Sequence, residues 1–361
     1  MLFLFACGGT GGHIFPALSV GEEMRRRDAR TRILYVCGKK DIENAIFNVA
    51  REEKVAVIET APFRGAFSLA DPLFLSKSLR GFFQSLRMVL KERPVLVVGF
   101  GGYVSFPVIA AAKCCGIPTM IHEQNVIPGK ANDLLAKHVD AVAMSFEETK
   151  KRWAALKNAR VTGNPIRTFI ERDCRQEALD FFRFSSGRKT LLVLGGSQGA
   201  DSINTLFLAC LEKLSENTRR RLQVLHLCGR MDPAESERAC EKAGVPAKAF
   251  AFFDRMDLAY GAADFCVGRA GATFLAEVVT KNIPMLLVPY PFSGGHQRAN
   301  AEAYRRLCGA YVVEQKDLDA DKLAVYLNKM MGEKEKGAAG HPAAGRAREE
   351  LAAYIEESAR K

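Results

Sequence analysis

Short apolar runs that alternate with helical patterns constrain the fold of this chain more than any other feature of its sequence. Each run has the length of a buried strand, and the segment that follows it carries apolar residues at helical spacing. Strands that alternate with helices build a parallel sheet with helices on both faces, so we expect an α/β, doubly wound architecture. The strand-like runs are residues 1–6, 32–37, 55–59, 95–99, 118–122, 141–144, 190–194, 223–228, 249–253, 265–268, 285–289 and 310–313.

The alternation is interrupted once, near the middle of the chain. A Gly-Asn-Pro turn at 163–165 is followed by a charged segment, 171–189, after which the alternation restarts. A length of 361 residues also suggests two domains. We therefore expect two Rossmann-like domains, residues 1–162 and 163–345, which face a central cleft at the carboxyl ends of their strands. A final helix at about 346–361 is expected to pack back on the first domain.

The first strand-like run leads into the stretch 7–20, C-G-G-T-G-G-H-I-F-P-A-L-S-V, in which the glycines are predicted to form a turn and the residues after Pro16 to begin a helix. Glycine lets backbone N–H groups approach a ligand closely, and the start of a helix adds a partial positive charge. The turn therefore predicts an anion-binding site with His13 at its rim. The P-loop spacing is absent, and Ile14 stands where a dinucleotide fingerprint needs glycine or alanine. A tight turn with an incidental histidine is the alternative.

Three further glycine loops follow predicted strands in the same way, at 99–105, 195–200 and 268–272. Loops in this position present backbone donors at the carboxyl end of a sheet, where α/β proteins bind phosphate groups. Four such loops suggest more than one phosphate-bearing ligand. Four unrelated strand-to-helix turns are the alternative.

The net charge of +11 points to an anionic partner, which could be nucleic acid, anionic lipid headgroups or a phosphorylated substrate. We expect no nucleic acid, because the sequence shows neither a basic stripe interleaved with stacking aromatics nor a known nucleic-acid motif. The ten cysteines include no C-x-x-C, so neither a zinc site nor a disulfide framework is expected. The adjacent Cys114 and Cys115 receive no role from the sequence.

No signal peptide or membrane span is expected. The apolar run at 1–6 lacks a basic flank and enters a glycine turn, and no stretch approaches the roughly 18 apolar residues of a spanning helix. Any membrane contact should therefore be peripheral.

Several motifs in a fixed order give the chain a family resemblance. They are G-G-T-G-G-H at 8–13, G-G-Y-V-S at 101–105, H-E-Q-N at 122–125, G-N-P-I-R at 163–167, G-G-S-Q-G-A at 195–200, R-A-G-A at 269–272 with Glu277, and H-Q at 296–297 with Asn300. Together they extend over nearly the whole chain. The chain resembles the MurG family, the bacterial N-acetylglucosaminyltransferases that convert lipid I to lipid II in peptidoglycan synthesis.

The resemblance implies a glycosyltransferase-B fold and an inverting, metal-independent transferase without a cofactor. The C-terminal domain would hold the donor, UDP-N-acetylglucosamine, and the N-terminal domain the acceptor, an undecaprenyl-pyrophosphoryl-muramoyl pentapeptide. The resemblance also implies a peripheral place on the cytoplasmic face of the cell inner membrane. Roles in cell wall biogenesis, cell shape, cell division and the cell cycle follow, with other cell-wall and division proteins as partners.

His13 is the candidate general base, because a histidine can take a hydroxyl proton near neutral pH. The alternative is that His13 only hydrogen-bonds a sugar or phosphate oxygen. Glu123 and Asn125 are candidates to share the catalytic work. By resemblance, the residues expected at the acceptor pyrophosphate are Gly9, Thr10, Gly101, Gly102, Tyr103, Ser105 and Asn132.

The donor site is expected to bind the diphosphate through loop amides at 195–199 and Arg167, and the ribose through Glu277. The D-x-D at 317–319 lies away from the glycine loops and is predicted to cap a helix. Gly295 departs from the family pattern, which is often acidic there, and so removes a carboxylate beside His296. The residues expected at the donor are Thr10, Gly11, Gly12, Asn125, Arg167, Ser197, Gln198, Phe253 near the uracil, Ala272, Thr273, Glu277, His296, Gln297 and Asn300.

Residues 72–91 are predicted to form a basic amphipathic helix, which can lie in the headgroup plane of a membrane. An ordinary helix packed on the sheet is the alternative. We favour partial membrane exposure because the acceptor implied by the resemblance is lipid-linked, although the apolar stripe is too wide for all of it to be exposed. The residues expected at the membrane are Leu73, Phe74, Leu75, Leu79, Phe82, Phe83, Lys77 and Arg80.

Two other functions stay open at this point. One is a related enzyme of the same fold, either a glycolipid synthase with a diacylglycerol acceptor or a nucleotide-sugar epimerase, and the identity of the product separates these. The other is a non-catalytic nucleotide-sugar binder at the membrane, which the basic charge permits.

Overall fold

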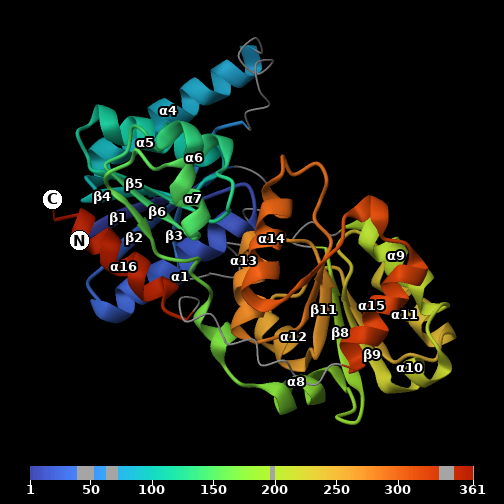
Figure 1. Cartoon of the computed structure of the whole chain (residues 1–361). Helices are drawn as coiled ribbons and strands as arrows, with labels where there is room; N and C mark the ends of the chain where they lie inside the picture. Colours follow the sequence, from blue (N-terminus) through green and yellow to red (C-terminus); the bar gives the residue numbers. More distant parts are fainter. Residues whose placement is uncertain (39–52, 62–71, 196–199, 333–344, 361) are drawn as a thin grey trace. The chain divides into compact units, whose positions relative to one another are not determined.

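The computed structural model describes residues 1–38, 53–61, 72–195, 200–332 and 345–360, and of 72–74 the helical backbone alone. These residues form two compact units, Met1–Arg167 with Ala343–Lys361, and Thr168–Pro342. Each unit is built on one parallel sheet, and helices lie between the successive strands except β2 and β3, whose connection lies largely outside the described residues (Figure 1). The prediction of two α/β, doubly wound domains is therefore confirmed.

The sheet of the first unit has the strand order β3-β2-β1-β4-β5-β6-β7, and every pairing is parallel. Its strands are β1 Leu2–Ala6, β2 Arg32–Gly38, β3 Lys54–Ile58, β4 Leu96–Gly99, β5 Thr119–Glu123, β6 Ala141–Met144 and β7 Ala159–Val161. All except β7 correspond to a predicted run. The sequence did not predict β7 because this edge strand is short and its central residue, Arg160, is exposed.

The helices of the first unit are α1 Gly11–Arg27, α4 Pro72–Glu92, α5 Gly102–Cys114, α6 Lys130–Leu135, α7 Glu147–Arg152 and α16 Ala347–Ser358. Helix α1 begins at Gly11 rather than after Pro16, so His13 lies in its first turn and not on a loop. Gly9 allows this early start, because its φ of +92° turns the chain sharply in a conformation that favours glycine.

The last helix of the chain belongs to the first unit. Helix α16 (red in Figure 1) lies beside α1 (blue) and adds Leu351, Tyr354 and Ile355 to the core that β1 and α1 build. Arg348 donates a hydrogen bond to the carbonyl oxygen of Ile166 at 3.1 Å. The chain's end is thereby tied to the segment where the first unit gives way to the second.

The sheet of the second unit has the strand order β10-β9-β8-β11-β12-β13, again with every pairing parallel. The strands are β8 Lys189–Leu194, β9 Leu222–Leu227, β10 Ala247–Phe250, β11 Phe265–Gly268, β12 Met285–Leu287 and β13 Tyr311–Val312. The helices are α8 Arg175–Phe182, α9 Asp201–Leu211, α10 Glu216–Arg221, α11 Pro233–Lys242, α12 Met256–Ala262, α13 Ala272–Thr280, α14 His296–Cys308 and α15 Ala320–Gly332, with short 3-10 turns at Thr168–Glu171 and Gln315–Asp317.

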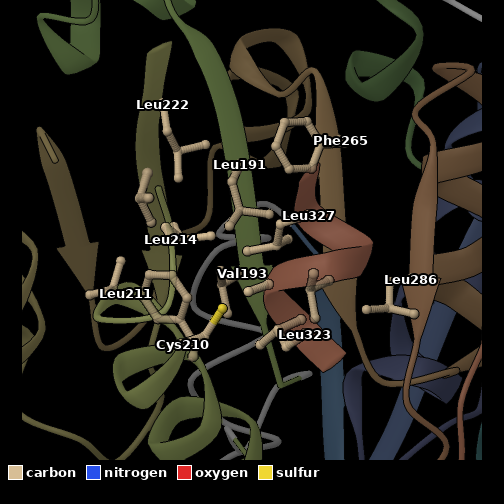
Figure 2. Packing of buried hydrophobic residues seen from close by; sticks show 14 of the residues in the cluster. Leu191, Val193, Cys210, Leu211, Leu214, Leu222, Phe265, Leu286, Leu323 and Leu327 are labelled. Carbon is tan, nitrogen blue, oxygen red and sulfur yellow. The ribbon is translucent and has the colours of Figure 1, made fainter. Parts of the chain in front are cut away.

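The core of the second unit lies between its sheet and the covering helices. Leu191 and Val193 of β8 face Leu323 and Leu327 of α15 (Figure 2). At the start of α15, Asp319 Oδ1 accepts the backbone N–H of Lys322 at 2.8 Å, which is the capping role predicted for the D-x-D segment. The apolar runs of the sequence thus form this core, and the carboxylates at 317–319 belong to a helix terminus.

Both sheets reverse their strand order at their first strand. Strand β1 lies between β2 and β4, and β8 lies between β9 and β11. At such a point the loops from neighbouring strands diverge, and α/β proteins bind ligands in the crevice that this leaves at the carboxyl ends. Glycine loops follow β1, β4, β8 and β11. The fold therefore places the strand ends that lead into the four predicted loops at two sites of the same kind, one in each unit, and residues 196–199 of the loop after β8 lie outside the described residues.

Candidate active site

In the first unit, the loops after β1 and β4 approach each other at backbone distance. A Cβ on Gly102 would lie 2.4 Å from the carbonyl oxygen of Gly8, which no side chain could tolerate. Gly101 and Gly102 also have positive φ values of 96° and 74°. Tyr103 covers the other loop, with its ring 3.3 Å from the position of a Cβ on Gly9. Glycine is thus required here by close contact and by conformation.

His13 lies against this pair of loops. A Cβ on Gly101 would be 3.0 Å from both Cε1 and Nδ1 of the His13 ring and 3.4 Å from Asn132 Nδ2. His13 Nδ1 is 3.0 Å from Oε1 of Gln124, the residue that follows β5. The structure therefore brings together His13, Gly101, Gly102 and Asn132, which the sequence predicted separately, and adds Gln124, which it did not predict.

Gln124 connects His13 to a second, fully buried histidine. Its Nε2 lies 3.0 Å from His122 Nδ1 and 2.9 Å from the carbonyl oxygen of Phe100, and His122 Nε2 lies 3.0 Å from the carbonyl oxygen of Gly163. Burial lowers the pKa of His122 to about 4, although the hydrogen bond to Gly163 acts in the opposite direction. His122 is therefore neutral at physiological pH.

Glu123 is buried and organises the loop after β5. Its Oε1 accepts the backbone N–H of Asn125 at 2.8 Å and the side-chain N–H of Asn125 at 2.9 Å. Its Oε2 accepts the backbone N–H of Gly129 at 3.0 Å and Asn132 Nδ2 at 2.8 Å. Four donors thus surround one carboxylate, which holds Asn125 and Asn132 in place.

The side chain of Asn132 presents a buried oxygen without a partner. Asn132 is 2% exposed, and within the described part of the chain its Oδ1 accepts no hydrogen bond. The amide cannot be flipped, because Nδ2 faces the Glu123 carboxylate and the carbonyl oxygen of His122. An oxygen in this state needs a donor, so it suits a ligand hydroxyl or N–H better than a phosphate oxygen.

Two other predicted residues of the first unit have different surroundings. Ser105 is fully buried, with its Oγ 3.0 Å from the backbone nitrogen of Gly101 and 3.2 Å from the carbonyl oxygen of Ala6, so it fastens β1 to the loop after β4. Arg167 places its guanidinium carbon 4.2 Å from the centre of the Phe15 ring on α1. That contact holds a cation near the first turn of α1.

In the second unit, β8 and β11 also approach closely, since a Cβ on Gly268 would lie 2.8 Å from the carbonyl oxygen of Leu194. The loop between β8 and α9 contains Ser197 and Gln198, which lie outside the described residues. Thr10, Gly11 and Gly12 of the donor set lie in the first unit at the start of α1. Their predicted ligand contacts stay predictions.

Glu277 is nearly inaccessible on α13, with 3% of its surface exposed. Its Oε2 accepts a hydrogen bond from the Tyr260 hydroxyl at 2.9 Å. Ala272 and Thr273, also in the predicted donor set, are buried in the first turn of the same helix. Tyr260, on α12, orients the Glu277 carboxylate that the sequence predicted. Nothing in the sequence pattern indicated Tyr260 itself.

Arg269 follows β11 and is a buried cation without a carboxylate partner among the described residues. Its guanidinium donates to the carbonyl oxygens of Val288 and Pro289 at 3.0 and 3.3 Å, and to Ser202 Oγ and Gln315 Oε1 at 2.7 Å each. All four acceptors are neutral. The positive charge at the carboxyl end of β11 is therefore uncompensated by these contacts, which favours a bound anion.

Helix α14 carries three predicted donor residues. Asn300 is fully buried and donates to the carbonyl oxygen of Ala270 at 3.2 Å, and Gln297 Oε1 accepts the backbone N–H of Tyr290 at 2.9 Å. His296 is the first residue of the helix. Gly295 before it has a φ of 86°, a left-handed conformation that favours glycine over an acidic side chain.

Phe253 lies after β10 in a cluster of aromatic rings. Its ring centre is 4.8 Å from that of Phe250 and 5.4 Å from that of Phe182. The cluster fixes the path of the backbone that was expected to meet the uracil, and that contact stays a prediction.

The predicted amphipathic helix is α4, and its exposed apolar residues form one stripe. Leu75, Leu79 and Phe83 are 42%, 58% and 62% exposed, and Leu90 continues the stripe at 59%. Arg80 is also exposed, whereas Lys77 and Phe82 are half-buried. The side chains of Leu73 and Phe74 lie outside the described residues.

The opposite side of α4 packs on the protein. Ser85 and Val89 are buried there, and Gly81 passes so close to the end of β3 that a Cβ would lie 2.1 Å from the carbonyl oxygen of Glu59. Part of the apolar surface is thus used for packing, as its width predicted. Along the described segments, no helix combines the length and apolar character that crossing a membrane requires. Nor do three or more His, Cys, Asp or Glu side chains gather there as a metal site.

Two family models match the chain. Residues 3–144 match the Glycosyltransferase family 28 N-terminal domain, and residues 190–356 match the Glycosyltransferase family 28 C-terminal domain. The first match covers most of the sheet of the first unit, and the second covers the sheet of the second unit and continues into α16 of the first unit.

Known proteins of similar length share one name, "UDP-N-acetylglucosamine--N-acetylmuramyl-(pentapeptide) pyrophosphoryl-undecaprenol N-acetylglucosamine transferase". The one from Halothermothrix orenii is 38% identical over 344 residues, which is 92% of this chain and 91% of that protein. The one from Geobacter sulfurreducens is 38% identical over 358 residues, or 98% and 94% of the two chains. The crystal structure of Acinetobacter baumannii MurG has a TM-score of 0.74 to this chain, covers 99% of both chains and is 24% identical. This last similarity confirms the predicted fold.

Proposed function

The chain belongs to the MurG family of N-acetylglucosamine transferases, and we infer its reaction from that family. Which unit binds the donor and which binds the acceptor we infer from the geometry of each unit. It transfers N-acetylglucosamine from UDP-N-acetylglucosamine to the lipid-linked muramoyl pentapeptide, lipid I, and so forms lipid II for peptidoglycan synthesis. The epimerase, the glycolipid synthase and the non-catalytic binder are all less favoured, because relatives that are 38% identical over nearly the whole chain carry the transferase name.

His13 is the general base of this proposal. It takes the proton from the muramoyl hydroxyl, whose oxygen then bonds to the anomeric carbon of N-acetylglucosamine. The bond from that carbon to the diphosphate oxygen breaks, and UDP leaves with the electron pair. Attack opposite to the leaving group inverts the anomeric configuration. The observation that carries this role is the position of His13 in the first turn of α1, its ring against Gly101 and its Nδ1 3.0 Å from Gln124 Oε1.

Glu123 is proposed to position the loop rather than to share the proton. Its two oxygens already accept four hydrogen bonds, which hold Asn125, Gly129 and Asn132 in place. The oxygen of Asn132 is proposed to accept a hydrogen bond from an acceptor-sugar hydroxyl or amide, because that atom is buried and lacks a donor among the described residues. The backbone N–H groups of the loops after β1 and β4 are proposed to bind the pyrophosphate of the acceptor.

The second unit is proposed to hold the donor. Glu277 accepts the ribose hydroxyls, with Tyr260 fixing one carboxylate oxygen at 2.9 Å. Arg269 supplies positive charge where the diphosphate develops its negative charge, and preorganised charge in a buried site stabilises a departing anion strongly. This arrangement supports metal-independent transfer, and activity that persists after exhaustive chelation with EDTA is the test.

Helix α4 is proposed to contact the membrane that carries the acceptor, on its cytoplasmic face, where UDP-sugars are available. Leu75, Leu79 and Phe83 form an exposed apolar stripe, and Arg80 lies beside it. Apolar side chains flanked by cations suit an anionic lipid surface. A peripheral place there would also bring the protein near other cell-wall and division proteins.

A transfer assay with labelled UDP-N-acetylglucosamine and a lipid I analogue tests the function directly. The expected result is label in a lipid product that carries the disaccharide. Folded protein that binds UDP but labels no muramoyl acceptor would contradict the function. Label in a diacylglycerol glycolipid, or conversion of the nucleotide sugar without any lipid, would instead identify one of the related enzymes.

A further inference from the structure

A chain of hydrogen bonds behind His13 determines which of its ring nitrogens carries the proton. The chain begins at Gly163, whose carbonyl oxygen lies 3.0 Å from His122 Nε2. A carbonyl oxygen can only accept, so Nε2 of His122 is its protonated nitrogen. Because burial keeps His122 neutral, with a pKa of about 4, its Nδ1 carries no proton and accepts a hydrogen bond.

The side-chain amide of Gln124 is therefore fixed in one orientation. Its Nε2 lies 2.9 Å from the carbonyl oxygen of Phe100, 3.0 Å from His122 Nδ1 and 3.1 Å from the carbonyl oxygen of His122, and all three accept. A flipped amide would place an oxygen against these three acceptors. Gln124 Oε1 therefore faces His13 Nδ1 at 3.0 Å, and that nitrogen must donate.

We propose that Gln124 is a positioning residue that holds the neutral His13 ring in the tautomer with a proton on Nδ1 and a bare Nε2. The proposal rests on the proposed role of His13 as general base. Nε2 has no hydrogen-bond partner among the described residues, so it is the nitrogen left to take the hydroxyl proton. In the opposite tautomer Nε2 already carries a proton and cannot accept another. His122 and the Gly163 carbonyl act through Gln124.

Long-range ¹H–¹⁵N spectra of the full-length protein labelled with ¹⁵N-histidine show which ring nitrogen of a neutral histidine is bare. Signals are assigned with His13→Asn and His226→Gln proteins. Near pH 8 we expect a bare Nε2 at His13. His226 is the internal reference, because its Nε2 donates to Asn204 Oδ1 at 3.0 Å and its bare nitrogen is Nδ1. A proton on His13 Nε2 in the wild-type protein overturns the proposal, whatever the activity.

Three variants separate positioning from general loss of structure. Gln124→Leu removes every hydrogen bond of the amide, whereas Gln124→Glu, protonated in this buried site, keeps one O–H donor for the carbonyl oxygen of Phe100 and an oxygen acceptor for His13 Nδ1. Gln223→Leu is the matched control, because Gln223 is also a buried glutamine, with its amide bonded to Ser185 and Thr190 in the second unit. We expect Gln124→Leu to shift His13 toward the Nε2-protonated tautomer, and the other two variants to keep the wild-type tautomer.

A shift of the His13 tautomer should also lower kcat. Gln124→Leu should lower kcat roughly tenfold with an unchanged KM for the donor, because one ordinary hydrogen bond sets the tautomer. The same His13 tautomer in Gln124→Leu and wild type would overturn the proposal. If the tautomer shifts and kcat stays at the wild-type value, the positioning role stands and the base role of His13 fails.

Discussion

The two units share one sheet topology but carry different side chains at the carboxyl ends of their strands. In each, the first strand lies between its two neighbours in the order 3-2-1-4-5 or its counterpart 10-9-8-11-12, and glycine stands where two loops or strands meet too closely for a side chain. In the first unit, the hydrogen-bonded chain His13–Gln124–His122 lies at the carboxyl ends of the strands. In the second unit, the buried cation Arg269 follows β11, and the buried carboxylate Glu277 lies on α13, the helix after that strand.

This difference indicates what each crevice can do. A neutral, hydrogen-bonded histidine suits proton transfer, whereas a buried cation with neutral partners suits an anionic leaving group. The shared topology provides two sites with backbone donors. In the proposed function, Gln124 after β5, Arg269 after β11 and Glu277 on α13 decide which reactant each site serves. Substitutions at His13 in the first unit should therefore lower kcat, and substitutions at Glu277 in the second unit should weaken binding of the donor.

The largest effect is expected for His13→Ala. Loss of the general base should lower kcat by roughly a hundredfold to ten-thousandfold, while the KM for UDP-N-acetylglucosamine stays near the wild-type value. Steady-state kinetics with a lipid I analogue measure both constants. A near-normal kcat of His13→Ala would show that His13 does not take the hydroxyl proton and only forms a hydrogen bond.

The two buried histidines predict acid destabilisation of each unit. Burial lowers the pKa of His122 and of His226 to about 4, below the value of about 6.5 in the unfolded chain. The unfolded state then binds more protons between these values, so the free energy of unfolding falls as pH drops through this window. The expected loss between pH 7 and pH 5 is about 2 kcal/mol for each histidine.

Trp153, the one tryptophan of the sequence, lies buried in the first unit, so its fluorescence reports that unit. The free energy of unfolding of the first unit is measured by urea titration of this fluorescence at pH 7 and pH 5. In His226→Gln the difference between the two pH values should equal that of the wild type. In His122→Gln the difference should be about 2 kcal/mol smaller. Equal behaviour of the two variants would show that the units do not respond separately.

Glu277→Ala should act on the donor rather than on the chemical step. Loss of hydrogen bonds from ribose to a buried carboxylate is expected to raise the KM for UDP-N-acetylglucosamine about tenfold to thirtyfold. Tyr260→Phe, which removes only the support of that carboxylate, should raise it by about threefold. A fall in kcat without a change in KM would place Glu277 at the chemistry instead.

The smallest effect concerns the membrane. Leu79→Glu with Phe83→Glu should weaken sedimentation with anionic vesicles by about threefold to tenfold, because both side chains are exposed and carry apolar contact area. Val325→Glu, an equally exposed change on α15 of the second unit, is the control and should leave vesicle binding unchanged. Unaltered binding of the α4 variant would show that α4 is not the membrane surface.

Features that depend on local pattern were predictable from the sequence. Buried strands appear as continuous apolar runs, and the glycine turns appear because close approach and positive φ leave glycine alone acceptable. The start of α1 was wrong by one helical turn or more, since Pro16 was taken as the signal and Gly9 makes the turn.

Contacts between distant residues were not predictable. Gln124 meets His13 across a separation of 111 residues, and Tyr260 meets Glu277 from another helix. No periodicity in the sequence records which side chains face each other after folding. The sequence therefore indicated which loops carry the candidate residues, and the structure was needed for the hydrogen bonds that orient His13 and Glu277.

The most direct test of this division of labour is the affinity for UDP, measured by titration calorimetry on wild-type, His13→Ala and Glu277→Ala proteins. We expect His13→Ala to bind UDP within about twofold of the wild type, and Glu277→Ala to bind it at least about tenfold more weakly. The opposite pattern, with UDP binding lost in His13→Ala and kept in Glu277→Ala, would contradict this division of labour.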